Sequence, residues 1–165
     1  MLYAAIQPQM DQRWDRTTCL DLGCNQGFFA FAVAKSGCRQ VVGIDHDQDC
    51  IADAGQLRKL YDLPNLSFRL VDLMKINEKE FDKFDIVLMM GLLSSIENPI
   101  AGLRKAAALT KRMLLIETEV LSNHTEISRQ PQERFKGAFG LIEAPENSGG
   151  FSLLPSTESL IWLLK

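Results

Sequence analysis

Three aspartates are the residues whose type and spacing best suit ligand chemistry. Asp21, Asp45 and Asp72 each stand at the end of a short apolar run. If these runs are parallel strands, their carboxyl ends meet at one edge of a sheet, where open α/β folds bind ligands. Taken singly, each aspartate could equally be a turn former, a helix cap or a solvated loop residue. Their coincidence at three successive strand ends favours a shared binding crevice.

Asp21 opens the segment Asp21-Leu22-Gly23-Cys24-Asn25-Gln26-Gly27, which predicts a tight turn between a strand and a helix. Gly23 and Gly27 leave out side chains where the backbone must approach a ligand and where the helix must approach the strand. Asn25 tolerates the left-handed backbone that such a turn often requires. Asp21 can then accept a hydrogen bond from a ligand ammonium group, directly or through water.

The other two aspartates indicate a nucleoside. Asp45 follows Gly27 at close to the interval at which an acid takes both hydroxyls of an adenosine ribose. A diol needs two acceptors held together, and one carboxylate supplies them. Asp72 ends the next strand, where a side chain can meet the exocyclic amine of adenine. His46 directly follows Asp45 and is expected at the rim of the crevice rather than as a base.

Short apolar runs alternate with helical patterns along most of the chain, which predicts an α/β fold with a mostly parallel sheet and helices on both faces. The expected strands are 18–22, 41–45, 66–71, 84–90 and 113–117. The expected helices are 26–36, one that ends at Asp62, 77–81, one that begins at Asn98-Pro99, and 157–164.

Helical spacing also predicts which faces are buried. The first helix is apolar nearly all round and should be packed in the interior. In the second helix the expected buried face contains Ile51, Ala54, Leu57 and Leu60 or Tyr61. In the helix after Pro99 the expected buried stripe contains Ile100, Leu103, Ala106 and Ala107.

The length of 165 residues, 46% of them hydrophobic, predicts a single domain over residues 1–165. Residues 1–16 are expected to form an N-terminal extension. Residues 121–155 are expected to form a loop or lid insertion, because most of the segment is polar. Such a long loop in a compact domain is usually a functional lid or a mobile loop. Arg129, Arg134 and Lys136 in this segment could meet a phosphate or carboxylate, although a mobile surface excursion explains the segment equally well.

The formal net charge of −3 argues against binding nucleic acid or an anionic membrane by bulk electrostatics. No stretch approaches the roughly 20 apolar residues that span a bilayer, so a cytoplasmic location is expected. The cysteines form no C-x-x-C pair and have no histidine cluster near them, so no metal site is expected. They are interpreted as reduced, buried or half-buried thiols: Cys19, Cys24, Cys38 and Cys50.

From Cys19 to about Val120 the chain resembles the class I methyltransferases that use S-adenosylmethionine (SAM). Their first motif is an acid followed by x-G-x-G-x-G, and here Asn25 replaces the middle glycine. The resemblance implies a Rossmann-like fold and places Asp45 at the ribose and Met90-Gly91 beneath the cofactor. The residues expected to contact SAM are Asp21, Gly23, Asn25, Gly27, Asp45, His46, Asp72, Leu73, Met90 and Gly91.

A narrower similarity is to the tRNA wobble-uridine carboxymethyltransferases and the uncharacterised methyltransferases grouped with them. It rests on short pieces, such as Met90-Gly91-Leu92-Leu93 followed by Asn98-Pro99 and the Pro155-Ser156 helix start. That family has Tyr-His where this chain has Ser94-Ser95, and the tyrosine helps to hold the carboxylate of carboxylated SAM. The difference favours ordinary SAM as the cofactor. The methyl acceptor stays open between a small molecule and a tRNA.

Methyl transfer is an in-line displacement for which the protein chiefly aligns the acceptor. If the acceptor is a hydroxyl, a nearby base could take its proton. The candidates are Glu117, Glu119 and His124, at and beyond the end of the fifth strand, which borders the methyl-donor side in the family. Each could instead be a solvated loop residue.

The family's sheet has a C-terminal antiparallel hairpin beside the fifth strand, and the sequence predicts that this hairpin is missing here. The chain is therefore expected to be a fragment or a shortened domain, with 113–116 on an open edge that could form a homodimer. Two other functions stay open. One is a methyltransferase-like cofactor-binding module without catalysis, and the other is a nicotinamide-dependent oxidoreductase, although Gly23 to Gly27 lacks the compact G-x-G-x-x-G arrangement.

Overall fold

The computed structural model describes residues 13–79, 81–120, 139–143 and 151–155. They fall into two compact units, which we treat separately. The first contains residues 1–90 and 104–116, and the second contains residues 91–103 and 117–165. The elements of the first unit are η2 (Trp14–Arg16), β1 (Thr18–Leu22), α2 (Phe28–Lys35), β2 (Gln40–Asp45), α3 (Gln48–Tyr61), β3 (Leu66–Leu70), η3 (Leu73–Lys75), β4 (Phe84–Met90), most of β5 (Thr110–Glu117) and the second half of α4 (Pro99–Ala108).

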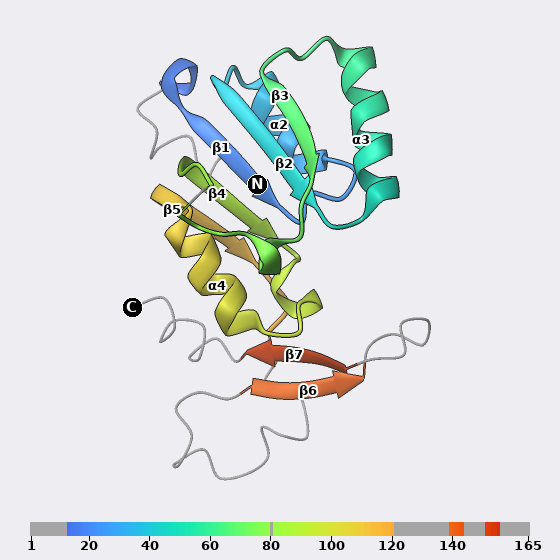
Figure 1. The fold of residues 1–165 in the computed structure, drawn as a ribbon, viewed down its shortest axis with the longest axis vertical. Helices are drawn as coiled ribbons and strands as arrows, with labels where there is room; N and C mark the ends of the chain where they lie inside the picture. Colours follow the sequence, from blue (N-terminus) through green and yellow to red (C-terminus); the bar gives the residue numbers. More distant parts are fainter. Residues whose placement is uncertain (1–12, 80, 121–138, 144–150, 156–165) are drawn as a thin grey trace. The chain divides into compact units, whose positions relative to one another are not determined.

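The first unit is built on a five-stranded sheet with the order β3-β2-β1-β4-β5 (Figure 1). The pairs β1–β2, β1–β4 and β2–β3 are parallel. The chain therefore runs outward from β1 to β3 and then crosses to the other side of β1, so β1 and β4 flank a topological switch point. Ligands of open α/β sheets bind at such a point, beyond the carboxyl ends of the strands.

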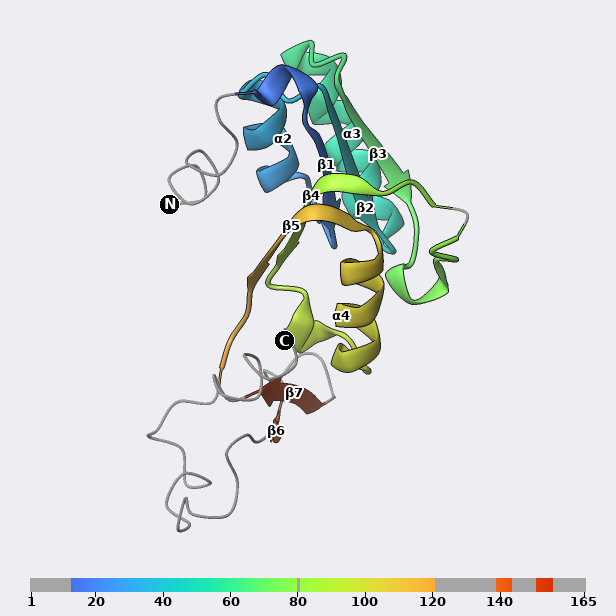
Figure 2. The same ribbon diagram turned by 90° about the vertical axis from the view of Figure 1, so that its left-hand side faces the viewer.

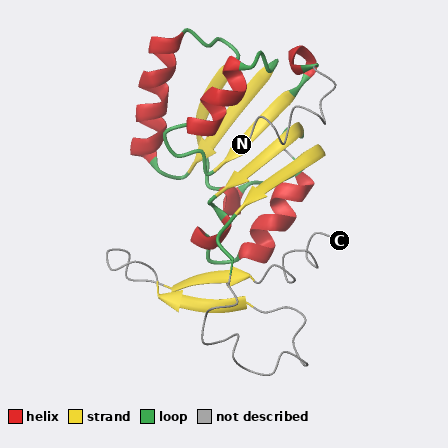
Figure 3. Ribbon diagram, turned by 180° about the vertical axis from the view of Figure 1, so that it is seen from behind, coloured by secondary structure: helices red, strands yellow, loops and turns green. Residues whose placement is uncertain are grey.

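Helices cover both faces of this sheet, which confirms the predicted α/β architecture. Seen from behind in Figure 3, α2 and α3 lie over one face, and α4 lies on the opposite face. In Figure 2, which is turned by 90° from Figure 1, α2 and α4 are again seen on opposite sides of the sheet. The core lies between α2 and the central strands and includes fully buried Cys19, Ala30, Val41 and Ile86.

The strand predictions agree with the structure to within a residue or so, except that β5 begins at Thr110 instead of 113. The helix predicted over 77–81 is wrong. A short 3-10 helix, η3, forms earlier in the same connection because Asp72 caps it, accepting a hydrogen bond from the Met74 amide at 2.8 Å. The described residues 77–79 and 81 form no helix, and the Phe81 amide donates to the Asn77 carbonyl at 3.1 Å.

Part of the predicted burial is also wrong, because apolar spacing does not show how wide a face the fold covers. In α2, Ala30, Phe31, Val33 and Ala34 are buried, but Phe28 is 78% exposed. In α3 only Ala54 is fully buried, while Leu60 is 80% exposed and Leu57 and Tyr61 are also exposed. In α4 Leu103 and Ala106 are buried as expected, and Ile100 and Ala107 are exposed.

The second unit contains η4 (Leu93–Ser95), the first turn of α4 and the strands β6 (Phe139–Glu143) and β7 (Phe151–Pro155). β6 and β7 pair antiparallel as a separate two-stranded sheet. These strands lie inside 121–155, where a loop or lid was expected, so the segment has secondary structure of its own. The Asn98 side chain caps α4 by accepting from the Ala101 amide at 3.0 Å, as predicted. The expected helix 157–164 and the extension 1–12 lie outside the described residues.

No helix in the described ranges is long and apolar enough to cross a bilayer.

Candidate functional site

Parallel register brings two of the predicted aspartates to the same edge of the sheet. Asp21 on β1 is level with Gly43 on β2, and Asp45 lies two positions further along β2, level with Leu70 on β3. Both side chains are nearly inaccessible, with Asp21 1% and Asp45 9% exposed. Asp72 follows two residues after Leu70, beyond the end of β3.

The turn after β1 has the backbone that its residue types predict. Gly23, Asn25 and Gly27 adopt positive φ angles of 66°, 48° and 88°. Asn25 tolerates this conformation because its side chain bonds locally, accepting from the Gln26 amide at 2.7 Å. Gly27 occupies the position before α2, and a side chain at this φ would be strained. The turn is therefore held in a shape that few residue types allow.

Both buried carboxylates are bound to this turn or to the helix that follows it. The Asn25 amide donates to Asp45 Oδ2 at 2.8 Å, and the Ala30 amide donates to Asp21 Oδ2 at 3.1 Å. The Cys24 amide also donates to the Ile44 carbonyl, which ties the turn to β2. The structure thus brings Asp21, Asp45 and the glycine turn together as one constellation.

Asp21 is the most perturbed acid in this constellation. Burial raises its pKa from 3.8 to about 7, the hydrogen bond from the Ala30 amide opposes the rise, and the nearby Asp45 carboxylate adds to it. Burial also raises the thiol pKa of Cys19 and of Cys24 above the usual range, so both sulfurs stay neutral at physiological pH. Asp21 therefore titrates near neutral pH in surroundings that favour a cationic partner.

Asp45 has a second set of contacts on its other oxygen. Oδ1 accepts from the Asp47 amide at 3.0 Å and lies 3.3 Å from Nδ1 of His46. The His46 side chain is 78% exposed. Asp47 itself caps α3, accepting from the amides of Asp49 and Cys50. The carboxylate of Asp45 is thus fixed in orientation by the backbone on both of its oxygens.

Asp72 has a different environment, because its carboxylate caps η3 and lies 3.3 Å from the Lys75 ammonium. The hydrogen bond from the Met74 amide and the contact with Lys75 lower its pKa. Its side chain is 34% exposed, whereas Leu73 beside it is buried. The charge of His46 adds a smaller lowering effect on the pKa of Asp72.

Phe68 on β3 packs against the turn, and it was not among the residues predicted for the site. Its ring lies against two glycines: an added Cβ would come within 2.5 Å of the ring at Gly27 and within 2.6 Å at Gly43. The ring also packs on Phe31, with ring centroids 5.5 Å apart. A glycine in the middle of β2 was the available signal, since glycine inside a strand often marks the close approach of another group.

The remaining predicted site residues lie at or after the end of β4. Met90 is the last residue of β4 and packs against the core of the first unit. In the second unit Gly91 has a φ of 68°, and its amide donates to the Glu117 carbonyl at 2.9 Å. A Cβ at Gly91 would lie 3.8 Å from Glu117 Oε2, and Glu119 is exposed. His124 lies outside the described residues.

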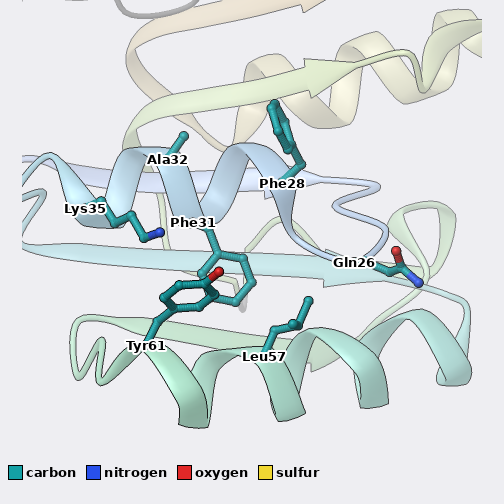
Figure 4. Close-up of a pocket in the computed structure, with 7 residues that line it drawn as sticks. All are labelled: Gln26, Phe28, Phe31, Ala32, Lys35, Leu57 and Tyr61. Carbon is teal, nitrogen blue, oxygen red and sulfur yellow. The ribbon is translucent and has the colours of Figure 1, made fainter.

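A separate apolar groove of about 470 Å³ runs between α2 and α3, on the face of the sheet that these two helices cover (Figure 4). Aromatic and aliphatic side chains form most of its lining, and the Lys35 ammonium lies 3.9 Å from the centre of the Tyr61 ring. None of the predicted cofactor contacts lines this groove. Its lining residues are Gln26, Phe28, Phe31, Ala32, Lys35, Leu57 and Tyr61.

Curated proteins similar in sequence to this chain are named as transferases of carboxymethyl or methyl groups. The chain is 28% identical over 168 residues to a tRNA U34 carboxymethyltransferase from Shewanella amazonensis, with 94% of this chain and 48% of the relative covered. It is also 28% identical over 92 residues to a ubiquinone biosynthesis O-methyltransferase from Neisseria meningitidis, with 56% of this chain and 39% of the relative covered. The chain thus spans about half the length or less of these curated relatives.

Solved structures share the fold. The N-terminal domain of EvdMO1, crystallised with SAH and D-fucose, matches with a TM-score of 0.73 and 20% identity over 98% of this chain and 70% of that one. The [4+2]-cyclase SpnF matches with a TM-score of 0.53 and 26% identity over 58% of this chain and 35% of that one. A family model described as a methyltransferase domain matches residues 15–145. The chain therefore belongs to the methyltransferase-domain family.

Proposed function

We propose that this chain is the cofactor-binding part of an enzyme that transfers the methyl group of SAM to a small molecule or a tRNA. The observation that carries the proposal is the pair of buried carboxylates: Asp45 accepts from a backbone amide of the glycine turn, and Asp21 accepts from an amide of the helix that follows it. Membership of the methyltransferase-domain family supports it.

The described residues fit SAM. Asp21 is a buried acid suited to the ammonium group of the methionine end, because a cationic partner offsets the cost of burying its charge. Asp45, aligned by the Asn25 and Asp47 amides, presents a fixed carboxylate to the ribose hydroxyls. Gly23 leaves the backbone open to close approach, and Asp72 accepts from the adenine amine. When bound, SAM supplies an electrophilic methyl group.

The residues that take part in the transfer itself are part of the same proposal. Glu117, Glu119 and His124 are the candidates for accepting a proton from a hydroxyl acceptor. The names of the two curated relatives indicate the acceptor class, since one acts on tRNA and the other in ubiquinone biosynthesis. The net charge of −3 favours an acceptor recognised locally over one bound through bulk electrostatics.

Calorimetric titration with S-adenosylhomocysteine (SAH) and with its 3′-deoxyribose analogue tests the ribose assignment. Asp45→Asn keeps the side-chain shape but removes the charge and one acceptor, so both the variant and the analogue should weaken binding by roughly 10- to 100-fold. The two losses should not add in the combination, because they remove one interaction. Asp82→Asn, at an exposed position before β4, is the matched control. Additive losses would rule out contact between Asp45 and the ribose.

A second candidate function is a cofactor-binding module that does not transfer methyl groups. The similarity to SpnF favours keeping it, because a protein named as a [4+2]-cyclase shares this fold at 26% identity. The Ser94-Ser95 pair, where the carboxymethyltransferase family has Tyr-His, is compatible with such a change. Methyl transfer from labelled SAM to tRNA and small-molecule pools separates the two functions, since the module would bind SAM and release no product.

A nicotinamide-dependent oxidoreductase is the remaining rival. Its pyrophosphate would have to lie near Asp21, and a buried acid repels that charge. Thermal shifts with SAM, SAH and NAD distinguish the two, because a ligand that binds only the folded state raises the melting temperature. We expect SAM and SAH to stabilise the protein and NAD to have no effect, and stabilisation by NAD alone would end the proposal.

The proposal extends to assembly and location. β5 is the last strand of the five-stranded sheet, and no other described strand pairs with its outer edge. An open edge of this kind suits pairing with a second copy of the chain. A cytoplasmic enzyme is proposed, since the four cysteines are free thiols.

A further inference from the structure

The connection between β3 and β4 carries Asp72 and Leu73, and it is held at its start and again at residues 76–78. At its start the Val71 amide donates to the Asp45 carbonyl at 2.8 Å, which ties it to the end of β2. Two of its own residues, Leu73 and Ile76, are buried. Residues 72–76 are therefore positioned by backbone and apolar contacts, while Asp72 keeps about a third of its side chain open.

The middle of the connection is held by Lys105, which lies on α4, far along the sequence. Its ammonium donates to the Ile76 carbonyl at 2.6 Å and to Glu78 Oε1 at 3.0 Å. The side chain is only 17% exposed. The pKa of Glu78 is lowered, first by its own backbone amide and then by Lys105. Charge-assisted bonds to a half-buried carbonyl and carboxylate are stronger than ordinary surface pairs.

We infer that Lys105 is a positioning residue for the adenine end of the cofactor, acting through residues 72–78. This inference rests on the proposed function, in which Asp72 accepts from the adenine amine. Asp72 caps η3, and η3 ends at Lys75, one residue before the carbonyl that Lys105 binds. Loss of Lys105 frees residues 76–78 of the connection and lets the Asp72 carboxylate move relative to Asp45.

The experiment compares binding of SAH and of S-inosylhomocysteine, in which a carbonyl oxygen replaces the adenine amine. The wild-type protein should prefer SAH by roughly tenfold or more, because inosine has an acceptor oxygen where the adenine amine donates to the Asp72 carboxylate. Lys105→Met keeps the apolar stem and removes the bonds. It should reduce that preference to about threefold or less while weakening SAH only modestly.

Two further variants separate positioning from simple stabilisation. Lys105→Arg can still donate to Ile76 and Glu78 and should restore the preference for SAH. Lys59→Met, an exposed lysine on α3, is the matched control and should leave the preference unchanged. A Lys105→Met protein that melts earlier but keeps the full preference would overturn the inference.

The test also separates this inference from the proposed function. A wild-type protein that does not bind SAH contradicts the proposed function itself. A wild-type protein that binds SAH and S-inosylhomocysteine equally well contradicts the role of Asp72, and with it the role of Lys105, while leaving SAM binding intact.

Discussion

At the scale of single residues, Asp21 shows how a site can oppose stability. Its carboxylate is almost completely buried, with a hydrogen bond from the Ala30 amide and a second acid, Asp45, nearby. Burial of this kind favours the protonated form and gives it a pKa of about 7. A residue chosen only for stability would be neutral here, so the acid is best explained by a ligand that needs it.

The first prediction concerns stability and its dependence on pH. Between about pH 4 and pH 7 Asp21 is protonated in the folded state and ionised in the unfolded chain, so its contribution falls as pH rises. Asp21→Asn avoids this loss and can still accept from the Ala30 amide. Its free energy of unfolding at pH 8 should exceed that of the wild type by about 1–3 kcal/mol. Urea unfolding from pH 4 to pH 8 measures the difference, which should shrink towards pH 4.

The second prediction concerns ligand affinity and has the opposite sign. A bound ammonium favours the ionised form of Asp21, so the affinity for SAH should rise by roughly five- to tenfold between pH 6 and pH 7.5. Calorimetry in two buffers of different ionisation enthalpy should show release of a proton. Asp21→Asn should bind weakly with no such dependence. His46→Gln should retain it, and a flat profile in that variant would assign the titration to His46 instead.

At the scale of secondary-structure elements, the turn after β1 depends on packing from β3. Phe68 fills the space that Gly27 and Gly43 leave open, so three separate segments must match. Protein interiors are close-packed, so little room is left at Gly27 or Gly43 for an added methyl group. The shape of the turn, and with it the position of the Asn25 amide on Asp45, follows from this contact.

The third prediction tests that contact. Gly43→Ala would place a Cβ 2.6 Å from the Phe68 ring and 2.9 Å from Cys24 Sγ, so it should destabilise the protein by about 1–3 kcal/mol. Phe68→Leu removes the ring that the new methyl group meets. The double variant should therefore be more stable than the sum of the single losses predicts. Strict additivity in denaturant unfolding would show that the ring is not the obstacle.

At the scale of the whole molecule, two surfaces could carry association. One is the outer edge of β5, and the other is the groove between α2 and α3 with its exposed apolar rim. Phe28 and Leu60, at 78% and 80% exposure, are unusually open for large apolar side chains. Exposed apolar rims and open strand edges are both recurrent sites of protein contact.

The fourth prediction distinguishes these surfaces. If copies of the chain pair through β5, Met113→Lys should reduce self-association by about tenfold or more, because a lysine on an edge strand opposes edge-to-edge pairing. Sedimentation velocity over a range of concentrations measures it. Leu57→Glu on α3 changes the lining of the groove and not β5, so it should leave the sedimentation behaviour unchanged. The reverse pattern would assign association to the groove.

Much of this protein could be predicted from local patterns. The alternation of apolar runs and helical spacing predicted each strand of the five-stranded sheet, and Asn98-Pro99 predicted the start of α4. The left-handed backbone of Asn25 was expected from its residue type, and the tight turn was expected from Gly23 and Gly27. These features depend on neighbours in the chain, and residue type constrains such backbone preferences directly.

Tertiary structure decided what depends on distant segments. The pKa of Asp21, the Phe68 ring against the glycine turn and the hold of Lys105 on the Asp72 connection all join residues far apart in sequence. The same is true of Phe28 and Leu60, whose apolar character predicted burial that the fold does not provide. Burial and contact are properties of three-dimensional packing, and a periodic pattern shows only which face of an element is apolar.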